Sequence, residues 1–497
     1  MTAAEAYAEL VRRTGEAATL ASASALLSWD QETYMPSGGG EHRGRQLALL
    51  AGLTHDRRTD PRIGELLDRC TMPAETPEAA DLREWRRGYD RAAKLPRRLV
   101  EELAETTSHA QQEWSAARTA NDFPRFAPWL SKVLALKREE AAAIGGGACA
   151  YDVLLDEFEP GAAVATLQPM FADLRERLAK LVQEVRQAPK QPNLDVLKGD
   201  FPIAAQEAFG KQAAADFGFD FSRGRLDVTA HPFCTTIGPG DVRLTTRSRP
   251  ECFGDGFFSI LHETGHGLYE QGLPAERYGR PTGDAASLGV HESQSRLWEN
   301  FVGRSAAFWA GRFAQLQEAF PAFGGAKLDP FVHAVNAVAP SFIRVDADEA
   351  TYNLHVLLRF ELEQELIADK LPIADLPAAW NERMQRLLGV TPPDDRRGCL
   401  QDVHWSCGLV GYFPTYTLGN LAAAQLFHAA DRALGGLEPL LRRGDFRPLL
   451  DWLRTNVHAH GQRWRPAELL RRATGQTLSA EALLAALRGK YAPLYGL

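Results

Sequence analysis

Two histidines and a glutamate in the run His262-Glu263-Thr264-Gly265-His266 are, by type and spacing, the residues of this chain best suited to chemistry. Residues four apart lie on one face of an α-helix, so both imidazoles point the same way. Two neutral imidazoles supply two of the three protein ligands that a catalytic zinc ion needs. Glu263 points in a neighbouring direction, towards the water that such a metal activates, where its carboxylate can act as a general base. The run therefore predicts a metal-dependent hydrolytic site.

The class of the site depends on the third ligand, which must come from outside the helix predicted over residues 255–272. A metzincin would have glycine at 269 and histidine at 272. This chain has Tyr269 and Gly272 there, so that class is excluded. Thermolysin-like and aminopeptidase-like spacings would place a glutamate at 285 or 286, and both residues are alanine.

Glu292 is the first strong candidate for the third ligand, on a second predicted helix that Ser287 can cap. An ion pair with Arg296, four residues on, explains Glu292 equally well. Local sequence leaves both interpretations open. Three other glutamates compete for the metal: Glu270, Glu276 and Glu299.

The elements around these residues are mostly helical in pattern, because apolar residues recur at three- and four-residue spacing through most of the chain. Residues 217–247 differ, with alternation, many β-branched residues and a turn signal at Gly238-Pro239-Gly240. We therefore expect a mainly α protein with a small antiparallel β-sheet just before the metal-binding helix.

A proline-rich stretch at 187–192 is the best candidate for a break in the chain. We expect a single peptidase unit over 1–497, with an N-terminal helical half at 1–190 and a catalytic half at 191–497 that contains the zinc-binding helices.

Composition excludes several classes of protein. The 497 residues are 45% hydrophobic and 24% charged, which is ordinary for a globular protein. A net charge of -8 without a basic block argues against a nucleic-acid partner. The N-terminus lacks the pattern of a signal peptide, and no apolar run is long enough to span a bilayer. The six cysteines are scattered without paired spacing, which is typical of reduced thiols, so we expect a cytoplasmic protein. Together with the charge and the lack of a long apolar run, this predicts neither a membrane nor a nucleic-acid partner.

Several short motifs, in order along nearly the whole chain, resemble those of the carboxypeptidase Taq family of zinc metallocarboxypeptidases. His262-Glu263-x-x-His266 is similar to the first zinc motif of that family, and His291-Glu292-Ser293-Gln294 is similar to its second zinc motif. The other motifs are Trp29-Asp30-Gln31-Glu32-Thr33-Tyr34-Met35-Pro36, His231-Pro232-Phe233, Asp241-x-Arg243-x-Thr245, Ile343-Arg344-x-x-Ala347-Asp348 and Gly398-x-x-Gln401-Asp402-x-His404-Trp405.

This resemblance implies that Glu292 is the third ligand beside His262 and His266, and that Zn2+, or alternatively Co2+, is the metal. It implies a helical fold of the neurolysin and angiotensin-converting-enzyme type, with a deep active-site cleft. It also implies a homodimer that removes single residues, with broad side-chain tolerance, from the C-termini of peptide substrates.

Hydrolysis also needs a donor for the oxyanion of the transition state. His404 and Tyr412 resemble the His/Tyr pair that has this role in related peptidases, and Tyr416 is expected to contact substrate. A buried aromatic cluster with Trp405 and Phe413 is the alternative interpretation of this segment.

A carboxypeptidase must in addition recognise a terminal carboxylate, which a guanidinium can do with two parallel hydrogen bonds. Arg344 is the leading candidate and Arg243 the second, and His231 is expected to line the same pocket. Alternatively, Arg344 pairs with Asp346 or Asp348 and has a structural role.

Two further hypotheses follow for the site and the activity. Asp348 and Asp402 are candidates to orient a ligand imidazole.

The alternative activity is that of a zinc oligopeptidase or endopeptidase on the same scaffold, which would share the metal site but lack an anchor for the substrate carboxylate. A structural zinc site is disfavoured, because such sites are rich in thiolates and the motif helices contain no cysteine.

Overall fold

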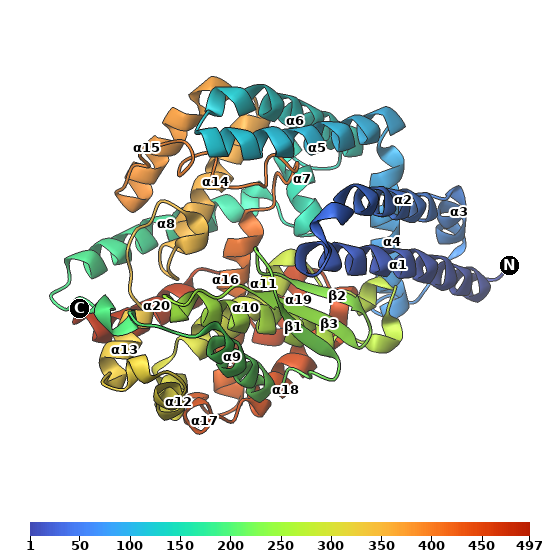
Figure 1. Cartoon of the computed structure of the whole chain (residues 1–497). Coiled ribbons are helices and arrows are strands. Elements are labelled where there is room, and N and C mark those ends of the chain that lie inside the picture. Colours follow the sequence, from blue (N-terminus) through green and yellow to red (C-terminus); the bar gives the residue numbers. More distant parts are fainter. The chain divides into compact units, whose positions relative to one another are not determined.

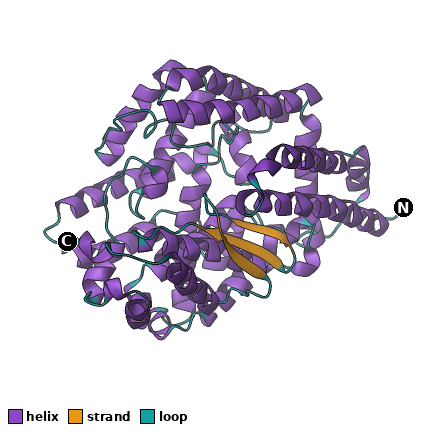
Figure 2. Cartoon of the chain, in the orientation of Figure 1, coloured by secondary structure: helices purple, strands orange, loops and turns teal.

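The computed structural model describes residues 1–497 and is mainly α-helical, which confirms the predicted fold class (Figures 1 and 2). The chain divides into two compact units. Unit 1 contains Met1–Ala92, Asn193–Val335 and Ala422–Leu478, and unit 2 contains Ala93–Pro192, Asn336–Leu421 and Ser479–Leu497. One of these boundaries falls at the end of the proline-rich stretch, while the division into halves at 190 stays a prediction. None of the helices combines the length and apolar character needed to cross a membrane.

The elements of unit 1 are α1 (Ala3–Thr33), α2 (Gly40–Arg58), α3 (Pro61–Arg69), α9 (Ile203–Phe217), β1 (Gly224–Val228), β2 (Cys234–Gly238), β3 (Asp241–Thr246), α10 (Phe253–Gly272), α11 (Leu288–Arg296), α12 (Ala306–Ala319), α13 (Leu328–Val335), α17 (Glu438–Arg443), α18 (Arg447–Asn456) and α19 (Pro466–Thr474). Those of unit 2 are α5 (Arg97–Ala120), α6 (Phe123–Ile144), α7 (Ala150–Phe158), α8 (Val164–Gln187), α14 (Tyr352–Ile367), α15 (Leu376–Leu388) and α20 (Glu481–Tyr495). The sequences of α4 (Pro77–Lys94) and α16 (Pro414–Ala433) each run across a unit boundary.

The small sheet of unit 1 is mixed rather than antiparallel, which corrects one detail of the predicted fold (Figure 2). Its strand order is β1-β3-β2. β2 pairs antiparallel with β3 through the predicted turn at Gly238-Pro239-Gly240, whereas β1 pairs parallel with β3. Alternation of side chains reveals strands but not their partners. The connection at 229–233 places β2 beyond β3, so β1 and β3 run in the same direction.

The helix α10 carries the His-Glu-x-x-His run and is buried on nearly all sides. In its first turns the rings of Phe253 and Phe257 stack with centroids 5.1 Å apart, and Trp309 of α12 lies 5.4 Å from Phe257. Further along, Leu268 is fully buried and β3 packs against the helix. Burying each large apolar side chain contributes roughly 1.5–3 kcal/mol. Packing therefore holds the backbone of α10 in place around its histidines.

α10 and α11 approach each other closely at Gly265. A methyl group on this residue would lie 2.5 Å from the carbonyl oxygen of Gln294 and 2.6 Å from Cα of Ser295. Real side-chain atoms do not come so close to backbone atoms, so only glycine permits this separation. The contact sets the distance between the histidines of α10 and Glu292 of α11.

We predict that Gly265→Ala forces α10 and α11 apart, which should reduce both stability and metal affinity. Overpacking of this kind typically costs about 1–3 kcal/mol. Urea unfolding and metal titration of the metal-free protein would measure the two effects. Gly254→Ala is the matched control in the same helix, because its new methyl group would meet only the ring of Phe258 at 3.8 Å. Equal metal affinity in the two variants would contradict the prediction.

Candidate metal centre and its surroundings

Three side chains of unit 1 converge as a candidate metal site. His262 and His266 come from α10 and Glu292 from α11, and their ligand atoms all lie within 4.8 Å of one another. Nε2 of His262 is 3.7 Å from Oε2 of Glu292, and Nε2 of His266 is 3.5 Å from the same oxygen. Two imidazole nitrogens and one carboxylate oxygen are a donor set that suits a catalytic zinc ion.

The outer nitrogens of both imidazoles have hydrogen-bond partners that orient the rings. Nδ1 of His262 lies 3.0 Å from Oε2 of Glu299, and Nδ1 of His266 lies 3.1 Å from the carbonyl oxygen of His291. Both partners are acceptors, so each Nδ1 donates its hydrogen, and a neutral ring then presents its Nε2 lone pair to the centre of the site. The residues present therefore fit a bound metal.

Glu292 makes the ion pair with Arg296 and still turns an oxygen towards the histidines, which is compatible with both interpretations that its sequence leaves open. Its Oε1 accepts a hydrogen bond of 2.7 Å from Nε of Arg296, while Oε2, which accepts one of 3.1 Å from Ser295, faces the histidines. The side chain is buried, so this ion pair is not a surface one. Burial raises the pKa of the Glu292 carboxyl, but Arg296 and the histidines outweigh it and hold the pKa well below its usual value.

Glu263 is also buried, and its surroundings have the opposite effect. Burial raises the pKa of its carboxyl to about 7, although the neighbouring His262 opposes the shift. A carboxyl group that exchanges its proton near neutral pH is well matched to general acid–base chemistry. Burial lowers the pKa of His266 to about 3, which keeps this imidazole neutral, as a metal ligand must be.

Glu299, which the sequence suggested only as a competing ligand, is the acceptor that orients His262. It lies in a π-helical turn, Leu297–Gly303, that continues α11, and it accepts a second hydrogen bond of 3.1 Å from Arg296. Arg296 thus contacts both Glu292 and Glu299. Wide π-helical turns recur at functional sites, but apolar periodicity does not reveal them.

The other two competing glutamates lie away from the ligand atoms. Glu270 pairs with His291, its Oε1 lying 2.8 Å from Nε2 of that histidine, and accepts a hydrogen bond from Thr236. The ring of His291 stacks on His266 with centroids 4.4 Å apart. Glu276 is exposed in a short helical turn.

The predicted transition-state residues cluster in unit 2. Nε2 of His404 is 3.2 Å from the hydroxyl of Tyr416, and the ring of Tyr412 lies 5.4 Å from that of His404. Phe413 packs against the same imidazole at 4.5 Å. Burial lowers the pKa of His404 to about 4 despite the nearby Asp402, so the ring is neutral at neutral pH.

Arg344, also in unit 2, has a different partner from those expected. Its Nε and Nη2 donate to Oδ1 of Asp402 at 3.1 and 2.9 Å, and its Nη1 donates to Tyr352 at 2.8 Å. The alternative ion pair with Asp346 or Asp348 is not the one that Arg344 makes, because its carboxylate partner is Asp402. Sequence spacing favours near neighbours, whereas the fold brings a carboxylate from a distant segment to this guanidinium.

Asp348 and Asp402 each have other partners than a ligand imidazole. Asp348 accepts hydrogen bonds from Ala339, Ala350 and Thr351, and so organises the chain before α14. Asp402 also pairs with Arg359, which is fully buried. The acceptors of the imidazole hydrogens are instead Glu299 and a backbone carbonyl.

Arg243 and His231 lie in unit 1, at the small sheet. Arg243 makes two hydrogen bonds to Asp241, of 2.8 and 2.7 Å, and its guanidinium lies 4.1 Å from the ring centroid of Trp29. His231 is exposed on the connection between β1 and β2.

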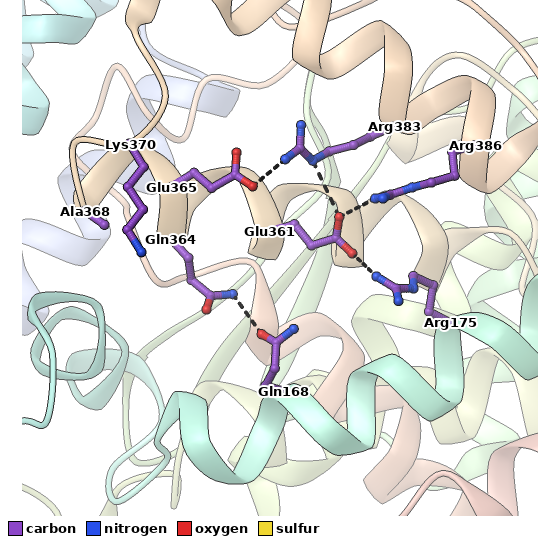
Figure 3. Close-up of a pocket in the computed structure, with 9 residues that line it drawn as sticks. All are labelled: Gln168, Arg175, Glu361, Gln364, Glu365, Ala368, Lys370, Arg383 and Arg386. Atoms are coloured by element: carbon purple, nitrogen blue, oxygen red, sulfur yellow. Dashed lines mark hydrogen bonds and ion pairs between the residues drawn. The ribbon is translucent and has the colours of Figure 1, made fainter.

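A separate polar hollow of about 340 Å³ lies in unit 2 among α8, α14 and α15, and no predicted site residue lines it (Figure 3). Glu361 accepts hydrogen bonds from Arg175 and Arg386, and Arg383 pairs with Glu365. Because its carboxylates and guanidiniums pair with one another, the hollow marks an ion-pair network that ties α14 to α8 and α15.

Comparisons with known proteins agree with this geometry. A sequence model of the family described as Carboxypeptidase Taq (M32) metallopeptidase matches residues 9–491. The chain is 49% identical, over 100% of both sequences, to Thermostable carboxypeptidase 1 of Thermus thermophilus. It is 38% identical, with 95% of each sequence covered, to Carboxypeptidase 1 of Bacillus subtilis. The crystal structure of an M32 carboxypeptidase from Deinococcus radiodurans R1 matches with a TM-score of 0.96 and 44% identity, over 99% of this chain and 100% of that one.

We predict that the carboxylates of the centre differ in their effect on metal affinity. Glu292→Ala should lose the metal, because a donor atom is removed, whereas Glu263→Gln should retain it. Glu299→Gln should weaken binding by about 10- to 100-fold, because a neutral amide is a poorer acceptor for the imidazole hydrogen. Titration of the metal-free proteins against a competing chelator measures these affinities. Glu276→Gln controls for the loss of one negative charge, and parental affinity in Glu292→Ala would rule out that residue as a ligand.

Proposed function

Because the chain belongs to the carboxypeptidase Taq (M32) metallopeptidase family and is a metallocarboxypeptidase, we propose that it uses zinc to release single C-terminal residues from peptides with broad specificity. The observation that carries this proposal is the convergence of two imidazole nitrogens and a carboxylate oxygen in unit 1. The buried Glu263 adjoins one of these ligands in the sequence.

We assign His262, His266 and Glu292 as the ligands of the zinc ion, and Co2+ suits the same donors as an alternative. When bound, the ion polarises the scissile carbonyl and lowers the pKa of a water molecule. The hydrogen bonds from both Nδ1 atoms support this assignment, because they leave both Nε2 lone pairs free to coordinate.

Glu263 is proposed as the general base. It would accept a proton from the attacking water and then deliver it to the leaving amine. A pKa raised to about 7 by burial supports both steps, since the carboxylate and the carboxylic acid are then both accessible near neutral pH.

His404 and Tyr412 are proposed to stabilise the oxyanion, and Tyr416 to bind substrate beside them. The neutral state of His404 supports its role, because a neutral imidazole still offers one N–H donor without the cost of a buried charge. Packing of the imidazole on Phe413 and its hydrogen bond to Tyr416 hold the ring in one orientation.

Arg344 is proposed as the anchor for the substrate's terminal carboxylate. Arg344, Arg359 and Asp402 form a buried group of two cations and one anion, with a formal charge of +1. A carboxylate bound there would neutralise this excess charge, and a guanidinium has more N–H donors than the three that Arg344 uses. Arg243 is the second candidate, and His231 is proposed to line the substrate pocket.

We also propose a cytoplasmic location and a homodimer. All six cysteines are free thiols, which supports a reducing compartment. The dimer is supported by the family resemblance of the sequence motifs.

The anchor predicts a strong preference for peptides with a free C-terminal carboxylate. An N-blocked tripeptide acid should lose its last residue, and the matching C-terminal amide should react roughly 30- to 1000-fold more slowly, which corresponds to about 2–4 kcal/mol. Arg344→Ala should remove most of this preference and Arg344→Lys should restore part of it, because an ammonium lacks the planar fork. Mass spectrometry of the products measures both rates and separates a C-terminal ladder from internal cuts.

Arg243→Ala is the matched control and should keep the preference. Equal cleavage of acid and amide by the parent enzyme would overturn the proposed activity. A preference that survives in Arg344→Ala would instead move the anchor to Arg243.

The oxyanion role predicts that His404→Ala lowers kcat by about 100- to 1000-fold while leaving KM and metal content nearly unchanged. The parental pKa of about 4 keeps the imidazole neutral, so this loss should be equal at about pH 6 and about pH 8. A protonated donor would behave differently, because its contribution would fade as the pH rises above its pKa. Stopped-time assays with matched metal loading measure the effect, and a rise in KM alone would place His404 in ground-state binding.

A further inference from the structure

Glu363 of α14 is a fully buried carboxylate for which the proposed reaction has no use. Its Oε2 accepts hydrogen bonds from the hydroxyl of Tyr151, at 2.6 Å, and from the backbone N–H of Gly411, at 3.1 Å. Its Oε1 accepts one of 2.9 Å from Nε1 of Trp405. Burial raises the pKa of Glu363 to about 7, although these donors oppose the shift. Burying a carboxylate is energetically costly, which indicates a role at position 363 that only a carboxylate can fill.

Two of the three donors flank the residues proposed to stabilise the oxyanion. Trp405 directly follows His404, and Gly411 directly precedes Tyr412. The segment between them, which we call the 404–412 segment, forms neither helix nor strand. Its internal bonds are turns, such as that from the N–H of Leu409 to the carbonyl of His404 at 2.9 Å. A single carboxylate therefore holds both ends of a segment that no regular element supports.

The chemistry of the two contacts dictates the type of residue at 363. Nε1–H of Trp405 and N–H of Gly411 are both donors and cannot accept, and they reach different oxygens of the Glu363 side chain. A carboxylate has two acceptor oxygens. The amide of glutamine has one, and its NH2 group would face one of the two N–H donors.

The helix α14 that carries Glu363 is itself held in place by ion pairs. Glu361 and Glu365, on the opposite face of α14, pair with arginines of α8 and α15 (Figure 3). On the other side of the contact, Gly411 has a φ of 86° and lies against α7, where a methyl group would be 2.8 Å from the backbone nitrogen of Leu155. Only a glycine therefore fits where the segment passes this close to α7.

We propose that Glu363 is a positioning residue for the reaction, which holds the 404–412 segment so that the His404 imidazole and the Tyr412 phenol keep their working geometry. This inference rests on the oxyanion role proposed above for those two residues. Glu363 contributes to kcat through them and not through substrate binding or the metal.

The test compares variants that break different bonds to the same carboxylate. Glu363→Gln should lower kcat on the order of 10- to 100-fold with KM and metal content unchanged, since small misplacements of catalytic groups have effects of this size. Trp405→Phe, which frees one end of the segment, should lower kcat in the same way. Tyr151→Phe is the matched control, because it removes a bond of the same carboxylate to α7 without touching the segment. It should keep the parental kcat even where its melting temperature falls.

A double-mutant cycle with His404→Ala separates positioning from a merely structural role. If Glu363 acts through His404, adding Glu363→Gln to His404→Ala should lower kcat by much less than it does in the parent. Fully multiplicative effects would overturn the inference, as would a parental kcat in both Glu363→Gln and Trp405→Phe. If Glu363→Gln fails to fold, the comparison of Trp405→Phe with Tyr151→Phe decides, and equal kcat in these two overturns it. A parental kcat in His404→Ala would instead refute the proposed oxyanion role on which the inference rests.

Discussion

A buried carboxylate, that of Glu292, has to lie between two imidazoles and a guanidinium, and much of unit 1 serves that arrangement. A carboxylate removed from water is costly unless charged or hydrogen-bonding partners surround it. Arg296 supplies the charge at Oε1 and Ser295 a hydrogen bond at Oε2. The histidines can face that oxygen only because Gly265 lets α10 and α11 approach closely. A change at any of these contacts alters the spacing of the donor atoms.

In unit 2 the same physical constraint applies around Asp402, where two guanidiniums share one carboxylate. Arg344 and Arg359 share the carboxylate of Asp402, which fixes the chain at the residue two before His404. Glu363 then accepts hydrogen bonds from Trp405 and Gly411, which lie further along the same segment. Each of these buried charged groups has partners that form directional hydrogen bonds with it. The bonds offset the cost of burial, and they also have a second effect. They determine where an otherwise irregular segment lies, which hydrophobic packing alone would leave less well defined.

Much of the candidate metal site could be predicted from sequence, because the positions of its histidines depend on local spacing. The helical repeat alone aligns His262 with His266 and directs Glu263 beside them. The helical class followed from apolar periodicity in the same way. Strand pairing did not follow, since alternation is the same for parallel and antiparallel neighbours. The partner of Arg344 was also missed, because proximity along the chain suggested Asp346 or Asp348.

The sequence by itself determined the donor types of the site, the helix that carries two of them and the membership of the family. Only the tertiary structure decided that Glu292 binds Arg296 with one oxygen while it turns the other to the histidines, and that Glu299 reaches His262 from a π-helical turn. The physical reason is one of range. Helical spacing is a local property of the backbone, whereas the acceptor that a buried donor finds depends on which distant segments pack against it. Glu363 shows this most clearly, since nothing in its local sequence indicates that it holds residues some forty positions away.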